Sequence, residues 1–238
     1  MSIIELQHID FSYQHTPVLT DFTLSIENGQ ITCLLGSSGS GKTTILRLIA
    51  GLEIPENGHV LINEKVVSSG KSLEVPPHKR NVGFVFQDLA LWPHMTVYKN
   101  VAFGLEQNRK KDKEKQVMEI LEFFQLSDQK DKFPHQLSGG QKQLVAIARS
   151  MVMQPHILLM DEPLANLDVK LKFRILNYIK EIRNRFGTAI VYVTHDHKEA
   201  FSIADEIIVL QNGKIEIKGS VEEVIRADNE YVKYFIEL

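Results

Sequence analysis

Cysteine and long apolar runs are both scarce in this sequence. Cys33 is the only cysteine among 238 residues, so no intrachain disulfide can form, and a cytosolic setting is the simplest expectation. Its mostly apolar neighbours in ITCLLG predict a buried strand residue and not a reactive thiol. Nowhere do about 18 apolar residues follow one another, and the first residues lack the basic and apolar segments of a signal peptide. We therefore expect neither a membrane span nor a secretion signal.

An excess of basic residues is also missing. The sequence has 27 Lys and Arg against 30 Asp and Glu, a formal net charge of −3, which leaves no electrostatic footprint for nucleic acid. We therefore expect no nucleic-acid partner. Apolar residues make up 43% and charged residues 24% of the chain, as is typical of a soluble globular protein that is large enough to bury a core.

Hydrophobic periodicity divides the chain into strands and helices. Alternating residues at 3–11 and 18–27 predict an N-terminal β-hairpin with its turn at 14–17. The other predicted strands lie at 30–36, 58–67, 80–86, 156–162, 189–195 and, as a final pair, 206–217. Helical spacing covers 42–51, most of the middle third from 97 to 152, and 169–186. Buried strands that alternate with helices predict an α/β fold with a mostly parallel sheet that binds ligands beyond the carboxyl ends of its strands.

A Gly-rich loop follows the strand at 30–36 and opens the next helix. Its sequence, GSSGSGKT, matches the phosphate-loop pattern in the strand, loop and helix context that the pattern requires. Backbone N–H groups of such a loop face nucleotide phosphates, and the helix N-terminus adds a favourable dipole. We expect Lys42 to reach the β and γ phosphates and Thr43 to ligate Mg²⁺. The alternative is a Gly/Ser-rich loop with an accidental lysine, but the context favours nucleotide binding.

Polar side chains stand at the ends of other predicted strands. Asp161 and Glu162 follow ILLM, and we expect Asp161 to hold Mg²⁺ through its water shell and Glu162 to polarise an attacking water. Gln87 closes the strand at 80–86, where its amide could bind Mg²⁺ or water. His195 ends the strand at 189–195, where its imidazole could face the γ-phosphate. Taken alone, the acidic pair could be an ordinary strand end and His195 a structural hydrogen-bonding group.

A second Gly-containing segment, LSGGQ at 137–141, precedes a helical run. Ser138 is a good N-cap, and Gly139 and Gly140 permit close backbone approach to an anion. In isolation this stretch would be only a turn before a helix. Together with the other motifs it predicts a second helix start that binds an anion.

The motifs of this sequence, taken in chain order, resemble those of the nucleotide-binding domain of ATP-binding cassette (ABC) transporters. They are Tyr13, GSSGSGKT, Gln87, LSGGQ, ILLMDE, LANLD and His195. The resemblance implies an ATPase with a P-loop NTPase core, an N-terminal antiparallel β subdomain and a helical insertion. We expect a single ABC ATPase domain over 1–238, with the core at 1–87 and 155–238 and a helical signature subdomain at 88–154. It also implies a head-to-tail homodimer, in which each ATP lies between the phosphate loop of one subunit and LSGGQ of the other.

The same resemblance assigns roles to individual residues. Tyr13, which alone would rank as a core aromatic, would stack on adenine. Gln87 would sense Mg²⁺ and the attacking water, Glu162 would be the catalytic base and His195 the γ-phosphate switch, while Asp161 would hold Mg²⁺ with Thr43. The remaining ATP contacts would come from the phosphate loop and, across the dimer, from the signature segment and a communication-loop aspartate: Gly36, Ser37, Ser38, Gly39, Ser40, Gly41, Lys42, Thr44, Ser138, Gly139, Gly140, Gln141 and Asp168.

Two longer segments resemble those of bacterial importers of sugars, polyamines, ferric iron and molybdate. Their sequences are PPHKRNVGFVFQDLALWPHMTVYKNVAFGL and FPHQLSGGQ. This implies integral membrane permease subunits docked at 89–105, a solute-binding protein outside the cytoplasm as an indirect partner, and a peripheral location on the cytoplasmic face of the inner membrane. Trp92 and Pro93 would belong to the permease surface or be merely structural. An ABC exporter or lipoprotein-release ATPase is an alternative; a soluble ABC protein of DNA repair or translation fits less well.

Departures from the family pattern occur at two positions and in the chain length. Leu144 stands where an arginine is usual, which puts a polar contact of the signature helix in doubt. Ala165 replaces a serine that is common in the loop before Asp168. Sugar-importer subunits also carry an additional C-terminal regulatory domain, so the sequence is either truncated or belongs to a shorter branch. The transported solute is not readable from this chain.

Overall fold

The computed structural model describes residues 1–105, 110–165 and 167–236. Residues 106–109 of the predicted helical subdomain and Asn166 of the LANLD segment lie outside this part. The strands are β1 Ser2–Tyr13, β2 Thr16–Glu27, β3 Ile31–Gly36, β4 Asn57–Ile62, β5 Lys65–Ser69, β6 Ser72–Leu73, β7 Val82–Val85, β8 Ile157–Asp161, β9 Ala189–Val193, β10 Glu206–Gln211 and β11 Lys214–Gly219.

Helices lie in all three predicted ranges, 42–51, 97–152 and 169–186, and three further short helices that the periodicity did not indicate follow residue 196. The α-helices are α1 Lys42–Ala50, α2 Val97–Ala102, α3 Lys110–Phe123, α4 Gly139–Met151, α5 Val169–Phe186, α6 His197–Ile203, α7 Val221–Arg226 and α8 Glu230–Ile236. Short 3-10 helices lie at Pro77–Lys79, Phe103–Leu105, Ser127–Gln129 and Pro134–Gln136. In the residues that the structure describes, no helix combines the length and the apolar character that a membrane crossing requires.

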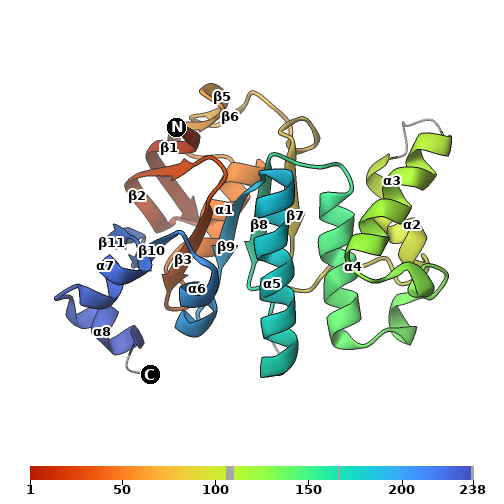
Figure 1. Ribbon diagram of the computed structural model, residues 1–238. Coiled ribbons are helices and arrows are strands. Elements are labelled where there is room, and N and C mark those ends of the chain that lie inside the picture. The colour runs from red at the N-terminus through yellow and green to blue at the C-terminus, as the bar shows by residue number, and fades with distance from the viewer. Residues whose placement is uncertain (106–109, 166, 237–238) are drawn as a thin grey trace.

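The main sheet has the strand order β11-β10-β3-β9-β8-β7. Neighbours from β10 to β7 are parallel, and β11 pairs antiparallel with β10. Figure 1 shows α5 and α6 in front of this sheet and α1 behind it. Along β3, Cys33 belongs to the core on one face and Leu34 to the core on the other, as the period of two in a strand requires. The predicted α/β fold with a covered, mostly parallel sheet is confirmed.

The burial of Cys33 follows from this arrangement. Its side chain is 0% exposed in the central strand β3, and burial raises the pKa of the thiol because the thiolate is disfavoured away from water. The prediction of a buried strand residue is therefore confirmed.

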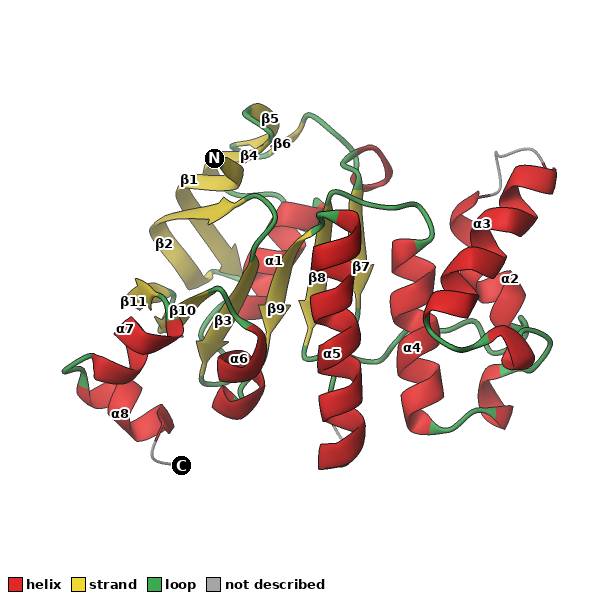
Figure 2. Cartoon of the chain, viewed as in Figure 1, coloured by secondary structure: helices red, strands yellow, loops and turns green. Residues whose placement is uncertain are grey.

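A second sheet, with the order β2-β1-β4-β5-β6, is antiparallel and carries the predicted N-terminal hairpin. Figure 2 shows these strands beside the main sheet, on the side away from α3 and α4. The single strand predicted at 58–67 is wrong, because β4 and β5 are separate strands that turn back at Asn63 and Glu64. Both residues have positive φ, 49° and 63°, and Asn tolerates this conformation better than most residues do.

Helices α2, α3 and α4 form the predicted helical region beyond the edge strand β7 (Figure 1). Helix α4 packs against β7, α2 and α3. On α4, Leu144 is 4% exposed and belongs to the hydrophobic core. The usual arginine would have to bury its charge at this position, so the leucine replaces a polar contact by apolar packing.

Candidate functional site

The phosphate loop lies between the carboxyl end of β3 and the first turn of α1. Gly36 cannot carry a side chain here, because a Cβ would lie 2.3 Å from the backbone oxygen of Leu210. Gly41 is the N-cap of α1 with φ of 100° and provides no side-chain cap. The first amides of α1 therefore keep their donors for a ligand, as at helix N-termini that bind phosphate.

Lys42 turns its ammonium group into this loop. Nζ donates to the carbonyl oxygens of Gly36 at 2.8 Å and Ser37 at 2.7 Å, and to Oγ of Ser40 at 3.3 Å. Burial lowers the pKa of Lys42, and the negative charges of Glu162 and Asp161 oppose this shift. An ammonium has three donors, and here the loop's own oxygens take all of them. A bound phosphate would compete with these oxygens for the same group.

Asp161 and Glu162 stand at the carboxyl end of β8 opposite the loop. Oγ1 of Thr43 donates to Oδ1 of Asp161 at 3.0 Å. Burial raises the pKa of Asp161, and the hydrogen bond from Thr43 opposes the shift. A hydroxyl and a carboxylate meet here, and hard oxygen ligands of this kind suit Mg²⁺. Within the described residues no group of three or more His, Cys, Asp or Glu side chains could hold a metal ion, so a metal here would need further ligands from phosphate and water.

Glu162 contacts His195, which lies two residues beyond the end of β9. Nδ1 of His195 is 3.1 Å from Oε2 of Glu162. Glu162 has a positive φ of 42°, and its backbone N–H donates to the oxygen of Val193 at 3.0 Å. This unusual backbone conformation, held by a bond to the neighbouring strand, directs the carboxylate toward His195.

A pocket of about 520 Å³ joins these groups. Its lining residues come from both sheets and from the ends of β7, β8 and β9: Tyr13, Val18, Ser38, Gly39, Gly41, Lys42, Thr43, Thr44, Gln87, Glu162 and His195. Tyr13 is 39% exposed, and its hydroxyl donates to Oε1 of Glu53 at 3.2 Å. The structure thus brings together residues that are up to 182 positions apart in the sequence, from Tyr13 to His195.

The signature segment does not line this pocket. Ser138 is the N-cap of α4: its Oγ accepts from the N–H of Gln141 at 3.3 Å, while Oε1 of Gln141 accepts from the N–H of Ser138 at 3.0 Å. Ser138 and Gly139 are exposed. Gly140 is buried, and a Cβ there would lie 2.4 Å from a methyl carbon of Leu171 on α5. The absence of a side chain at Gly140 is therefore required by helix packing, which the sequence did not reveal.

Asp168 also lies outside the lining of the pocket. It is the N-cap of α5, and its Oδ1 accepts from the N–H of Leu171 at 3.0 Å. A side-chain oxygen at this position satisfies one of the unpaired amides at the start of the helix. Asp168 thus stabilises the start of α5 within its own chain, in addition to the expected position at a dimer interface.

Tyr231 of α8 is a contact of the phosphate loop that sequence reasoning missed. Its hydroxyl accepts from the N–H of Ser37 at 3.1 Å and donates to the backbone oxygen of Leu210 at 3.4 Å. No local pattern could indicate a contact between residues 194 positions apart in the chain. Helix α8 therefore contacts the phosphate loop through Tyr231.

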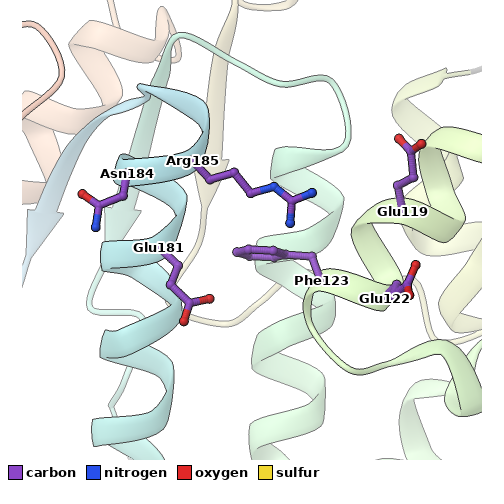
Figure 3. A pocket seen from close by; sticks show the side chains of 6 residues that line it. All are labelled: Glu119, Glu122, Phe123, Glu181, Asn184 and Arg185. Carbon is purple, nitrogen blue, oxygen red and sulfur yellow. The ribbon is translucent and has the colours of Figure 1, made fainter.

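A larger concavity of about 680 Å³ lies between α3 and α5 (Figure 3). Arg185 reaches from α5 over Phe123 of α3, with its guanidinium carbon 5.3 Å from the ring centroid. The remaining lining includes the carboxylates of Glu119, Glu122 and Glu181. Three acidic groups repel a polyphosphate, so this concavity is a poorer nucleotide site than the smaller pocket at the phosphate loop.

A third concavity, of about 450 Å³, separates α4 from the segment that follows β7. Arg149 of α4 crosses it, donating to the backbone oxygens of Ala90 at 2.6 Å and Leu89 at 2.7 Å. Its guanidinium carbon also lies 4.9 Å from the ring centroid of Trp92. We call this the Trp92 groove; its lining includes Phe84, Phe86, Trp92, Gly104, Arg149 and Met153.

Comparisons with known proteins identify the family of this chain. A family model described as "ABC transporter" matches residues 19–165. An Fe(3+) ion import ATP-binding protein of Fusobacterium nucleatum is 44% identical over 98% of this chain and 62% of its own length. A spermidine/putrescine import ATP-binding protein of Haemophilus influenzae is 42% identical over 93% of this chain and 59% of its own length. The chain therefore spans about three fifths of the length of these relatives.

A shorter relative and two solved structures match along nearly their whole length. A probable sulfate/thiosulfate import ATP-binding protein of Chlorella vulgaris is 42% identical, with 100% of both chains covered. The structure of cbiO1 from Clostridium perfringens, part of an ABC transporter complex, has a TM-score of 0.86 at 28% identity and covers 100% of this chain and 99% of its own. The ATP-binding cassette MJ0796, a dimer bound to ADP and Pi, has a TM-score of 0.82 at 31% identity and covers 92% and 98%.

Proposed function

Because this chain belongs to the ABC transporter family, we propose that it is an ATPase that powers a bacterial importer. ATP binding closes a homodimer, and hydrolysis to ADP and phosphate reopens it. The observation that carries the proposal is the meeting of Glu162 and His195, 3.1 Å apart, in the lining of a pocket that also contains the phosphate loop. The pocket volume of about 520 Å³ is within the range of small-molecule sites.

The proposed substrate, ATP, would place its adenine at Tyr13 and its phosphates at the phosphate loop of this pocket. Tyr13 stacks on the adenine ring, since its aromatic side chain lines the pocket and is 39% exposed. The amides of the loop and the first turn of α1 bind the phosphates. Lys42 exchanges its contacts with the oxygens of Gly36 and Ser37 for the β and γ phosphates, which bear full negative charge.

Glu162 acts as the general base in the proposed reaction. Its carboxylate accepts a proton from a water whose oxygen attacks the γ-phosphorus, and the bond from that phosphorus to the bridging oxygen of ADP breaks. His195 holds the Glu162 carboxylate in place through Nδ1 and directs its ring toward the γ-phosphate. Gln87, which is exposed in the same pocket, orients the water with its side-chain amide.

Mg²⁺ is the metal that suits the oxygen atoms of Thr43 and Asp161, which meet at 3.0 Å. When bound, it would neutralise charge on the β and γ phosphate oxygens. Thr43 and Asp161 would hold it, with Gln87 as a third group in reach of the same pocket. The raised pKa of Asp161 is in keeping with a carboxylate that gains a cationic partner only in the loaded site.

The homodimer is supported by the exposure of Ser138 and Gly139 outside their own subunit's pocket. Their position at the N-terminus of α4 suits an anion, so we assign them, with Gln141, to the γ-phosphate of ATP held by a second subunit. Asp168, at the start of α5, contacts that second subunit as well. A solved relative, MJ0796, is a dimer bound to ADP and Pi, which supports this arrangement.

A membrane permease is the proposed partner at the Trp92 groove. The groove is lined largely by aromatic and apolar side chains, and Phe86 in its lining directly precedes Gln87, so an inserted helix of the permease would contact the segment that carries Gln87. The subunit would then sit on the cytoplasmic face of the inner membrane, and a solute-binding protein would deliver solute to the permease. The names of the relatives, which import iron, polyamines or sulfate, support importer function without fixing the solute.

The proposal is tested by Glu162→Gln, measured as phosphate release and as ATP binding in separate assays. Loss of the base should abolish turnover, while binding persists because the phosphate loop is intact. Glu222→Gln, at an exposed residue on α7 paired with Arg226, is the matched control and should behave as wild type. A Glu162→Gln variant that hydrolyses ATP at the wild-type rate would remove Glu162 from its role.

A further inference from the structure

A buried carboxylate, Glu199, lies behind the loop that carries His195. It is 5% exposed on α6. Its Oε2 accepts from the hydroxyl of Tyr192 at 2.7 Å and from Oγ1 of Thr194 at 2.9 Å, and its Oε1 is 2.6 Å from Nζ of Lys172. Burying a carboxylate is costly unless each oxygen has a donor, and here both have one.

Lys172 connects this carboxylate to α5. Its Nζ also lies 3.2 Å from Oδ2 of Asp196. Burial opposes the charge of Lys172, but the hydrogen bonds and negative charges of Glu199 and Asp196 outweigh it, so the pKa is raised. Burial likewise works against the charge of Asp196, but the hydrogen bond and charge of Lys172 prevail and its pKa is lowered. Both shifts favour the ionised pair at neutral pH.

The network fixes the chain on both sides of His195. On one side, Thr194 is bonded to Glu199, and its Oγ1 accepts from the N–H of Asp196 at 3.0 Å. On the other side, Asp196 caps α6 by accepting from the N–H of Lys198 at 2.9 Å and pairs with Lys172. The imidazole between them is 64% exposed and has Glu162 as its own partner. The direction of His195 therefore depends on its contact with Glu162 and on the backbone that its two neighbours hold, more than on packing around the ring.

The same network reaches the expected dimer interface. Lys172 lies one turn beyond Asp168, the N-cap of α5. A single ammonium group thus joins the start of α5 to the loop of His195 and to the start of α6. The loop of His195 runs directly into α6, whereas α5 is a separate element of the chain.

We propose that Glu199 and Lys172 are positioning residues, which hold His195 against Glu162 and couple it to the start of α5. The inference rests on the proposed ATPase function. An ion pair needed only for stability could be replaced by apolar groups at little cost, whereas a pair that aligns a reacting group could not. Loss of the pair should therefore lower kcat more than it weakens ATP binding.

The test compares Lys172→Met with Arg183→Met on the same helix. Arg183 pairs with Asp205 at 2.8 Å, and the two side chains are 34% and 32% exposed, so the control removes a more exposed ion pair 11 residues further along the same helix. Lys172→Met should lower kcat by about 10- to 100-fold and leave the KM for ATP nearly unchanged. Lys172→Arg, which keeps the charge, should recover most of the rate, and Arg183→Met should retain it.

A second measurement observes His195 without hydrolysis. In histidine-labelled protein, the ring signals of His195, assigned with His195→Gln, should shift or broaden in Lys172→Met and stay in place in Arg183→Met. If the single variant unfolds, Lys172→Met/Glu199→Gln removes both charges together and should show the same loss of rate. A folded variant with wild-type kcat and unchanged His195 signals would overturn the proposal. If the wild-type chain hydrolyses no ATP, the proposed function fails, and the His195 signals still decide the positioning role.

Discussion

Gly140→Ala should destabilise the protein because of packing, whatever the role of the signature segment in binding ATP. The new Cβ would lie 2.4, 2.6 and 2.9 Å from three side-chain carbons of Leu171. The last of these is Cγ, so a rotation of the methyl groups alone cannot relieve the clash. Overpacking of this kind costs about 1–3 kcal/mol. For a chain of this size, that corresponds to a melting temperature lower by roughly 2–12 °C.

The neighbouring glycine provides the matched control for this prediction. A Cβ at Gly139 would lie 3.6 Å from a side-chain carbon of Leu167, which is an ordinary contact. Gly139→Ala should therefore leave the stability of the protein unchanged or raise it slightly, because Ala loses less conformational entropy than Gly in a helix. Leu171→Ala removes the atoms that clash, so the double variant should lose less stability than the two single variants added together. Thermal unfolding followed by circular dichroism measures all four proteins. Equal melting temperatures for Gly140→Ala and Gly139→Ala would refute the packing argument.

Two further predictions concern the opposite walls of the nucleotide pocket. Lys42→Met should weaken ATP binding by roughly 10- to 150-fold, because a hydrogen bond from a charged group contributes about 1.5–3 kcal/mol. Calorimetric titration measures the affinity, and an unchanged value would contradict the role of Lys42 in binding phosphate. Asp161→Asn should raise the melting temperature of the nucleotide-free protein at neutral pH, because a carboxylate whose folded pKa is raised costs stability while ionised. The difference in melting temperature should shrink as the pH falls through the raised pKa of Asp161 toward the ordinary value of 3.8. A difference that stays constant over this pH range would contradict the raised pKa of Asp161.

The parts of the fold that the sequence predicts best are those with strong local signals. The helix predicted at 169–186 is α5 with the same bounds, because Asp168 caps its first turn and Gly187, with φ of 66°, ends it. The phosphate loop is similarly local, since one strand, three closely spaced glycines and one helix define it. The turn between β4 and β5 was missed because Asn63-Glu64 lacks the glycine that marks a tight hairpin.

The relations that only the structure provides join segments far apart in the chain. The meeting of Glu162 with His195 depends on β8 and β9 being neighbours in a parallel sheet, which the order of motifs alone does not specify. The clash that requires glycine at Gly140 depends on Leu171 of another helix. The pairing of Lys172 with Glu199 had no local signal either, because an isolated lysine or glutamate on a helix is most often an exposed residue.

The central claim is that each nucleotide is shared between two copies of this chain. Sedimentation velocity of the Glu162→Gln variant, with and without ATP, tests it most directly, because blocked hydrolysis should hold the closed state. We expect a monomer without ATP, a dimer with ATP, and no dimer when Ser138→Arg places a bulky side chain at the exposed start of α4. A Glu162→Gln protein that binds ATP and remains monomeric, or that dimerises equally well with Ser138→Arg, would contradict the shared site.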